Sequence, residues 1–372
     1  MNITQNLSKD LKIQFEKVQN FLKHHTSRAY LVGGGVRDMV MNRAPKDIDI
    51  EVYDIDDVCF DKLMKKLGAK GVGKSFFVYK IGDIDISLPR VEKKSGIGHK
   101  AFEVKLCNDE KEASKRRDFT MNAMMIDIFD GKVLDFYGGI KSIKNKTITL
   151  VDENSFKEDS LRVLRAVQFS ARLGFKIDEK TLKVMSEISL DDLSKTRVFW
   201  ELEKLFYASN LHFGLYYMYR LNLFEKLSTC RAKNELFCRC VKELKRGQRD
   251  FEEPLYPYYF IYIVANLLSC DISGFLKSIE APKHYERALK RQPFVEGFVD
   301  DRSLKEIAVE IPIKKWLGNY KRGVKKRAKE QGIWDKVYDG GVKISDIIKD
   351  GFQKEEIKKE YKKRVMKCIN MC

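Results

Sequence analysis

Three consecutive glycines, Gly33, Gly34 and Gly35, constrain the fold of this chain more than any other feature. An apolar run at residues 30–32 precedes them and a run compatible with a helix follows, so we expect a strand, a tight turn and a helix in that order. Such a turn lets backbone N–H groups at the start of a helix approach an anion such as phosphate closely. Arg37, one turn into the expected helix, adds a positive charge beside it.

Two aspartates, Asp47 and Asp49, follow this turn in a segment that has the pattern of a strand. Because side chains alternate across a strand, both carboxylates are expected on one face, with Ile48 and Ile50 packed on the other. Two adjacent carboxylates repel each other unless a divalent cation lies between them, and metal-dependent phosphoryl transfer needs such a pair. An Asp-x-Asp strand alone is more typical of a protein surface, so the glycine turn upstream is what favours a site.

A third carboxylate for this site has two candidates. Glu51 continues the face of Asp49, but Asp85 is the better candidate, because an adjacent antiparallel strand would bring it across from Asp47 and Asp49. We therefore expect Asp85 as the third acidic residue of the site.

Residues 68–75 match the phosphate-binding pattern GxxxxGK[ST], but their context argues against that function. A working loop of this kind follows a buried strand and opens a helix, whereas here residues 60–67 have a helical pattern and residues 76–81 a strand pattern. The triple glycine also fails the dinucleotide pattern GxGxxG, because Asp38 stands where the last glycine is required.

Arg116, Arg117 and Asp118 form the second cluster of candidate site residues. Arginine suits a phosphate or a base edge, and a carboxylate suits ribose hydroxyls. Taken alone, the segment is more typical of a surface ion pair.

Asp159, Arg162 and Arg165 form the third cluster, spaced three residues apart on an expected helix. This spacing places them in one polar stripe, which presents both donors and acceptors to the edge of a base. The alternative is an ordinary solvated ion pair.

The pattern of apolar residues divides the chain into two kinds of structure. Short strand-like runs alternate with helical segments between about residues 28 and 135, which predicts an α+β head with a small mixed sheet. After about residue 148 the strand signals fade and helical spacing dominates. The last sixty residues are rich in lysine and arginine, with Trp316, Tyr320, Trp334 and Tyr361 between the basic runs.

Charge and composition narrow the class of protein. A net charge of +17 indicates attraction to a polyanion, and nucleic acid is the expected partner. No apolar run approaches the length of a membrane span, and residues 7–22 have the spacing of an amphipathic helix rather than a signal peptide, so we expect a cytoplasmic protein. The eight cysteines contain no CxxC pair, which argues against structural zinc and for reduced thiols.

In this order and spacing the clusters resemble the superfamily of class II tRNA nucleotidyltransferases and bacterial poly(A) polymerases. The resemblance covers about residues 28–206. The matching segments are LVGGGVRD at 31–38, DID at 47–49, RRDFTMNAM at 116–124, DFYGG at 135–139, EDSLRVLRA at 158–166 and a later helical motif at 193–204.

The resemblance implies a polymerase-β-like head at residues 1–148, a helical neck with a nucleotide-selecting helix at 149–212, and a basic, tRNA-binding body and tail at 213–372. It implies Mg²⁺-dependent addition of CCA to the 3′ end of tRNA from CTP and ATP, with release of pyrophosphate. Neither a membrane nor an obligate protein partner is expected.

The resemblance also assigns a role to each candidate residue. The implied metal ligands are Asp47 and Asp49, and the implied triphosphate contacts are Gly33, Gly34 and Arg37. Arg117 and Asp118 would contact the ribose. Asp159 and Arg162, assisted by Arg165, would pair with the incoming base and so replace a nucleic-acid template.

Three positions depart from the family pattern. Gln168 stands where the family often has another arginine, which implies a weaker triphosphate contact. Ser142 replaces an acidic residue that usually follows the glycine pair of residues 135–139, and Phe136 replaces the usual proline of that motif.

Other functions within the superfamily stay open at this point. Addition of CC alone or A alone uses the same motifs, and the glycine-containing loop at residues 90–100 does not reveal which nucleotides are added. A poly(A) polymerase is disfavoured because the arginines expected at 72–78 are missing. A catalytically inactive RNA-binding protein is disfavoured by the presence of Asp47 and Asp49, and a phosphohydrolase domain by the absence of a His-Asp dipeptide.

Overall fold

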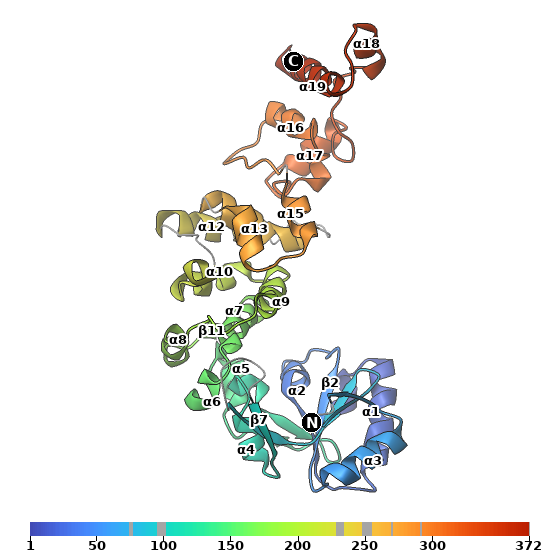
Figure 1. Ribbon diagram of the computed structural model, residues 1–372, viewed down its shortest axis with the longest axis vertical. Coiled ribbons are helices and arrows are strands. Elements are labelled where there is room, and N and C mark those ends of the chain that lie inside the picture. Colours follow the sequence, from blue (N-terminus) through green and yellow to red (C-terminus); the bar gives the residue numbers. More distant parts are fainter. Residues whose placement is uncertain are drawn as a thin grey trace. The chain divides into compact units, whose positions relative to one another are not determined.

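The computed structural model describes residues 1–73, 77–94, 102–227, 234–247, 255–268, 271–290 and 292–371. These residues divide into two compact units, the first formed by residues 1–170 and 174–194 and the second by residues 171–173 and 195–372. Many elements of both are labelled in Figure 1. The finer division into head, neck, and body with tail stays a prediction. Lys74 and Ser75 of the rejected phosphate-loop match, and residues 95–100 of the expected loop, lie outside the described residues.

A seven-stranded mixed sheet organises the first unit, in the order β3-β4-β5-β2-β1-β8-β9. Its strands are β1 (Ala29–Val32), β2 (Ile48–Val52), β3 (Lys70–Gly73), β4 (Val78–Ile81), β5 (Ile84–Ser87), β8 (Met125–Asp127) and β9 (Val133–Leu134). β1 is antiparallel to both β2 and β8, whereas β2 and β5 are parallel. The α+β head with a small mixed sheet that we predict from the sequence is confirmed.

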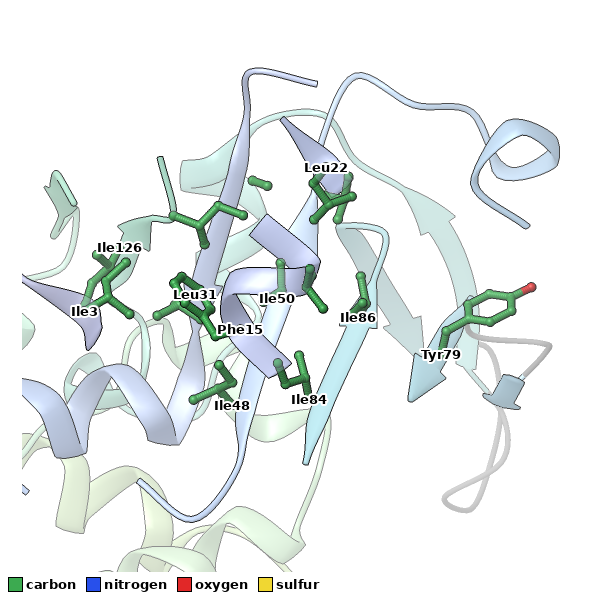
Figure 2. Packing of buried hydrophobic residues seen from close by; sticks show 14 of the residues in the cluster. Ile3, Phe15, Leu22, Leu31, Ile48, Ile50, Tyr79, Ile84, Ile86 and Ile126 are labelled. Carbon is green, nitrogen blue, oxygen red and sulfur yellow. The ribbon is translucent and has the colours of Figure 1, made fainter. Parts of the chain in front are cut away.

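One face of this sheet is apolar because the branched residues alternate with polar ones along each strand. Leu31, Ile48, Ile50, Ile84 and Ile86 are buried in one cluster. Figure 2 shows these side chains gathered with Phe15 and Leu22 of α1 (Lys9–Leu22). Burying each such side chain contributes about 1.5–3 kcal/mol, so this face fixes the register of the strands.

Helix α1 itself follows from the sequence. Leu11, Phe15, Val18 and Leu22 recur at helical spacing and are all buried, which confirms the predicted amphipathic helix. The Ser8 hydroxyl begins the helix by accepting a hydrogen bond from the Leu11 N–H at 3.3 Å. On the same face as α1, α3 (Asp57–Leu67) adds Phe60 and Met64 to the core.

The opposite face of the sheet carries a smaller cluster and leaves room for polar residues. Tyr30, Val32, Tyr53, Ala113 and Met125 pack there beside α4 (Glu110–Lys115). The polar side chains of β2 and β5 project from this face, since they alternate with the isoleucines.

The remaining elements of the first unit extend the head. They are η1 (Ile3–Asn6), α2 (Gly33–Val40), the pair β6 (Arg90–Lys94) and β7 (Phe102–Leu106), η3 (Thr120–Asn122), α5 (Gly139–Lys144), β10 (Thr147–Ile148), α6 (Glu153–Lys157), α7 (Leu161–Leu173), β11 (Lys176–Ile177) and α8 (Glu179–Ser186). β10 and β11 form a short parallel pair, so strand structure extends slightly past residue 148.

The described part of the second unit is helical. Its helices are α9 (Lys195–Phe206), α10 (Leu211–Arg220), α11 (Leu223–Leu227), α12 (Asn234–Gly247), α13 (Tyr256–Leu267), α14 (Ile272–Ser278), α15 (Lys283–Leu289), α16 (Asp301–Ala308), η4 (Ile313–Lys315), α17 (Val324–Glu330), α18 (Ile344–Lys349) and α19 (Glu355–Met371). The expectation of a helical remainder is confirmed.

Three of the aromatic residues between the basic runs lie in the interior. Trp316, Tyr320 and Trp334 are all buried, with Trp316 fully inaccessible. Trp316 and Trp334 belong to the core that α16 and α17 share. A small helical region needs large apolar side chains for its own core, and these rings supply them. Across the described residues no helix is both long and apolar enough to cross a membrane.

Candidate active site

The glycine turn is the first turn of α2, which begins at Gly33 directly after β1, and the absence of side chains there lets other groups pack closely against it. Gly33 has a φ of +73°, and a Cβ added there would lie 3.2 Å from both Arg117 Nη1 and Asp49 Oδ2. A Cβ at Gly35 would lie 3.2 Å from Ile48 Cγ2 and 3.3 Å from the Asp47 carbonyl oxygen. Glycine at these positions therefore lets β2 and a guanidinium approach the start of α2.

Asp49 lies beside this turn, on the polar face of the sheet. It is paired in register with Val32 of β1 on one side and with Asp85 of β5 on the other. Asp47 lies just before β2, which begins at Ile48. The predicted neighbourhood of Asp85 and Asp49 is present, but our expectation of an antiparallel pairing is wrong: the two strands are parallel, because β4 lies between β3 and β5 and reverses the chain first.

The Asp49 carboxyl is electrostatically strained. Its side chain reaches solvent, yet protein atoms crowd it, and this desolvation raises its pKa to about 6, with Asp85, Asp47 and Glu51 adding repulsion and Arg117 opposing them. A carboxylate in this setting gains from a nearby cation.

Asp85 already has a cationic neighbour. Lys80 on β4 is its register partner, and Lys80 Nζ lies 3.4 Å from Asp85 Oδ1. Within the described ranges no three His, Cys, Asp or Glu side chains stand close enough to hold a metal by themselves. The role of Asp85 as a third acidic residue therefore stays a prediction.

Glu51 lies on the same strand as Asp49 but in a different environment. It is 1% exposed, and its Oε1 accepts hydrogen bonds from Arg116 Nη2 at 3.0 Å and Arg117 Nη2 at 2.8 Å. The Tyr53 hydroxyl donates to Oε2 at 3.3 Å. Both carboxylate oxygens are thus engaged inside the protein, which agrees with setting Glu51 aside as a metal ligand.

Arg37 lies in the helix after the turn, as expected, but its guanidinium is buried. It donates to Asp38 Oδ1 through Nε at 2.9 Å and to Asn122 Oδ1 through Nη1 at 2.9 Å. The bond to Asn122 ties α2 to η3, and the guanidinium lies beside Gly34, where an added Cβ would be 3.6 Å from Arg37 Nη2.

Asp118 is the centre of a buried polar network. Its Oδ1 accepts from Asn122 Nδ2 at 2.9 Å, and its Oδ2 accepts from Arg165 Nε at 2.7 Å. Burial alone would raise the pKa of Asp118, but Arg165, Asn122 and Arg162 outweigh it and hold the pKa below its ordinary value.

Asn122 is a residue that our reasoning from the sequence missed. It connects Arg37 to Asp118, and so joins the glycine turn to α7 through Arg165. It stands within the matched segment 116–124, but nothing in the pattern distinguishes a buried amide from an exposed one.

The third cluster lies at the start of α7, which begins at Leu161, so Asp159 precedes the helix rather than belonging to it. Asp159 Oδ1 accepts from the Leu161 N–H at 3.2 Å. Arg162 donates to the Ser155 carbonyl at 2.7 Å and to the Arg116 carbonyl at 2.6 Å. Burial lowers the pKa of Arg162, although Asp118 and Asp159 oppose the shift. Arg162 and Arg165 thus both reach the segment 116–118.

The motif at residues 135–139 is structural. Asp135 accepts from the N–H groups of Gly139 at 2.6 Å and Ile140 at 3.0 Å, and so stabilises the start of α5. Ser142, one of the three departures, is buried and pairs with the Thr120 hydroxyl at 2.8 Å. Phe136 is exposed and Gln168 is buried.

Comparison with known families matches two regions of the chain. Residues 29–149 match the Poly A polymerase head domain, and residues 174–228 match the probable RNA and SrmB-binding site of polymerase A. The first region contains the sheet, the glycine turn and the carboxylates of Asp47, Asp49, Glu51, Asp85 and Asp118.

Among curated relatives, the CCA-adding enzyme of Lactococcus lactis is 33% identical over 219 residues, which is 55% of this chain and 52% of that protein. The CCA-adding enzyme of Buchnera aphidicola subsp. Cinara cedri is 38% identical over 241 residues, or 61% and 57% of the two chains. The chain thus aligns with a little over half the length of each of these relatives.

Solved structures resemble the chain over nearly its whole length. The Bacillus stearothermophilus CCA-adding enzyme in complex with CTP has a TM-score of 0.66 at 21% identity, covering 98% of this chain and 94% of that one. The Thermotoga maritima CCA-adding enzyme complexed with tRNA has a TM-score of 0.69 at 20% identity, covering 100% and 94%. At this identity the likeness establishes the fold.

The matched head domain and the shared fold define the class of protein. Residues 29–149 are a Poly A polymerase head domain, and the fold of the whole chain is that of the solved CCA-adding enzymes.

Proposed function

We propose that this chain adds CCA to the 3′ end of tRNA without a nucleic-acid template, using CTP and ATP. The observation that carries the proposal is the position of Asp49: it lies beside the glycine turn, next to Asp85 in register and close to Arg117. The names of the relatives, which are CCA-adding enzymes over the matched region, support the choice of reaction.

Asp47 and Asp49 are the proposed ligands of Mg²⁺. Two carboxylates suit this ion, which is usually held by one or two acidic side chains and by the phosphates of its substrate. The raised pKa of Asp49 fits a cation at this place, and the glycines that begin α2 fit a triphosphate beside it. When bound, Mg²⁺ would neutralise charge that develops on the α-phosphate during attack by the tRNA 3′-OH.

The other residues are proposed to bind and orient the nucleotide. Gly33 and Gly34 admit the triphosphate to the start of α2, and Arg37 holds that turn in shape. Arg117 and Asp118 remain our candidates for the ribose, and Asp159, Arg162 and Arg165 for the base. Selection of C or A by such a site depends on unpaired hydrogen-bonding groups when the wrong base enters.

The second unit contains a basic groove that supports a tRNA partner. This hollow, of about 1340 Å³, is lined from α12, α17 and the segment before α17. Its cationic residues are Lys245, Arg246, Lys321, Arg322, Lys325, Lys326 and Lys329. The one carboxylate that lines it, Glu243, already accepts hydrogen bonds from Tyr320 and Arg246, so positive charge dominates. Phe298 at its edge is 78% exposed.

One assay tests the proposed reaction. The protein is incubated with Mg²⁺ and with tRNAs that end before CCA, after the second C, or with complete CCA, together with CTP, ATP or both. We expect extension of the first two to CCA and then arrest. Failure to complete CCA from the shortest tRNA with both nucleotides present would contradict the proposal and favour addition of CC or A alone, whereas long adenosine tails on arbitrary RNA would indicate a poly(A) polymerase.

Two substitutions test the assigned roles. Asp47→Ala is expected to abolish addition while tRNA binding stays close to wild type, which also excludes an inactive RNA-binding protein if wild type is active. Arg162→Ala is expected to weaken or relax nucleotide choice; unchanged kinetics with both CTP and ATP would remove it from base selection. The cytoplasmic location stays a prediction.

A further inference from the structure

We propose that Glu51 is a positioning residue of this site, which anchors Arg117 so that its guanidinium faces the glycine turn without closing on Asp49. The inference rests on the proposed function, because it assumes that a nucleoside triphosphate binds at the turn.

The burial of Glu51 is the first observation. A carboxylate that is 1% exposed is destabilising unless it is paired, and Glu51 is paired with two arginines and a tyrosine hydroxyl. It lies on the polar face of β2, two residues from Asp49, where an ordinary strand residue would reach solvent. The two arginines cover it.

The geometry of Arg117 is the second observation. One nitrogen, Nη2, donates to Glu51 at 2.8 Å, while the other, Nη1, lies close enough to the turn that a Cβ at Gly33 would be 3.2 Å away. The Nε–H has no acceptor among the residues that the structure describes. The hydrogen bond to Glu51 therefore orients the guanidinium, with one edge held and the other presented to the turn.

The charges around Arg117 give this anchor its function. Asp49 attracts the same guanidinium, since Asp49 Oδ2 and Arg117 Nη1 both approach Gly33, each 3.2 Å from where a Cβ would stand there. Without the negative charge of Glu51, Arg117 is free to move onto Asp49, where it would compete with Mg²⁺ for the carboxylate and leave the turn. Glu51 thus keeps one cation available for the triphosphate and one carboxylate available for the metal.

The chain offers a closely matched control on the same head. Glu110 accepts from Arg28 Nε at 3.0 Å and from the Tyr30 hydroxyl at 2.9 Å, an arrangement like that of Glu51 with Arg117 and Tyr53. Arg28 also pairs with Asp54. Neither Glu110 nor Arg28 is among the nearest neighbours of Gly33, Gly34 or Gly35. A Glu110→Gln variant therefore removes a similar anchor and no hydrogen bond of Arg117 or Glu51; its link to the site is the packing of Arg28 and Tyr30 against Tyr53.

The test compares E51Q, E51D, E110Q and wild type. Binding of CTP in the presence of Mg²⁺ and without tRNA is measured by calorimetry, and addition kinetics are measured with varied CTP and varied Mg²⁺. For E51Q we expect about a tenfold weaker CTP affinity, the size of one lost charged hydrogen bond, together with a higher Mg²⁺ requirement. The rate at saturating CTP and Mg²⁺ should fall less than threefold, and E51D, which keeps the charge, should recover part of the affinity.

The outcomes separate structure, positioning and the proposed function. Urea unfolding shows whether E51Q and E110Q lose similar stability; if E51Q is the less stable, it is assayed at a temperature at which it is folded. Wild-type CTP affinity in folded E51Q, or an equal loss of affinity in E110Q, overturns the inference while leaving the proposed reaction intact. Wild-type protein that binds CTP but adds no nucleotide overturns the proposed function, whereas absence of CTP binding by wild type overturns both.

Discussion

The close packing around Gly33 makes a quantitative prediction for the variant Gly33→Ala. At a φ of +73° an alanine pays a backbone penalty of about 1–2 kcal/mol, because its Cβ crowds the following carbonyl. The same Cβ would lie 3.2 Å from Arg117 Nη1 and from Asp49 Oδ2, a separation shorter than most Cβ contacts. Both groups are ends of side chains, so they are expected to yield by a few tenths of an ångström.

That small displacement falls on the groups proposed to meet the nucleotide. Since a misplacement of about 1 Å can reduce a rate on the order of 10²-fold, a shift of a few tenths is expected to reduce kcat/KM for CTP roughly tenfold. The free energy of unfolding should fall by about 1–2 kcal/mol, mainly from the backbone term. The assays are urea unfolding followed by circular dichroism, and single-nucleotide addition to a tRNA that lacks CCA.

Gly68 provides the control for the backbone term. It ends α3 with a φ of +82°, and a Cβ there would meet nothing within 4 Å. Gly68→Ala is expected to lose about the same stability, 1–2 kcal/mol, and to keep wild-type kcat/KM. If the two variants lose activity equally, or if Gly33→Ala keeps full activity, the closeness of Arg117 and Asp49 to the turn has no role in nucleotide addition.

Three further predictions concern charge. The pKa of Asp49 is about 6 in the folded protein and 3.8 ordinarily. Ionised Asp49 therefore lowers the free energy of unfolding, fully above about pH 6. This loss of stability disappears as the pH falls toward about 4. Without Mg²⁺, Asp49→Asn is therefore expected to be more stable than wild type at pH 7, and a gain that does not shrink on acidification contradicts the assigned strain. Asn122→Ala should reduce the free energy of unfolding by about 1–3 kcal/mol, because buried Arg37 and Asp118 each lose one hydrogen-bond partner. Unchanged stability in urea would show that water replaces the amide. Affinity for tRNA should fall steeply between low and physiological salt. Replacing both Lys245 and Arg322 by alanine should reduce the magnitude of the slope of log K against log salt concentration by about 1–2. An unchanged slope would exclude the basic groove from the tRNA interface.

The local features of the site are readable from the sequence. Glycine between an apolar run and a helical pattern predicts a strand, turn and helix, and the alternation around Ile48 and Ile50 predicts which face Asp49 occupies. Each of these rests on a period or a turn preference that acts over a few residues, and each is present in the structure.

The long-range features are not readable in this way. The strand pattern indicates that Asp85 lies beside Asp49. Whether their two strands run parallel or antiparallel depends on the strands between them, and β4 is the one that reverses the chain before β5. The partners of Glu51 are distant in sequence, and a glutamate on a strand gives no sign of two arginines above it. For the same reason the burial of Trp316 and Trp334 depends on helices that the basic runs around them do not reveal.

Because β1 lies between β2 and β8, the head cannot complete its sheet early in synthesis. Tyr30 pairs with Glu51 on one side, which is available at once, but with Asp127 on the other. The loop closure that this second pairing requires is entropically costly and slows folding. A nascent chain that ends before β8 therefore exposes the edge of β1, and a ribosome that stalls there leaves an apolar strand open to association with other chains.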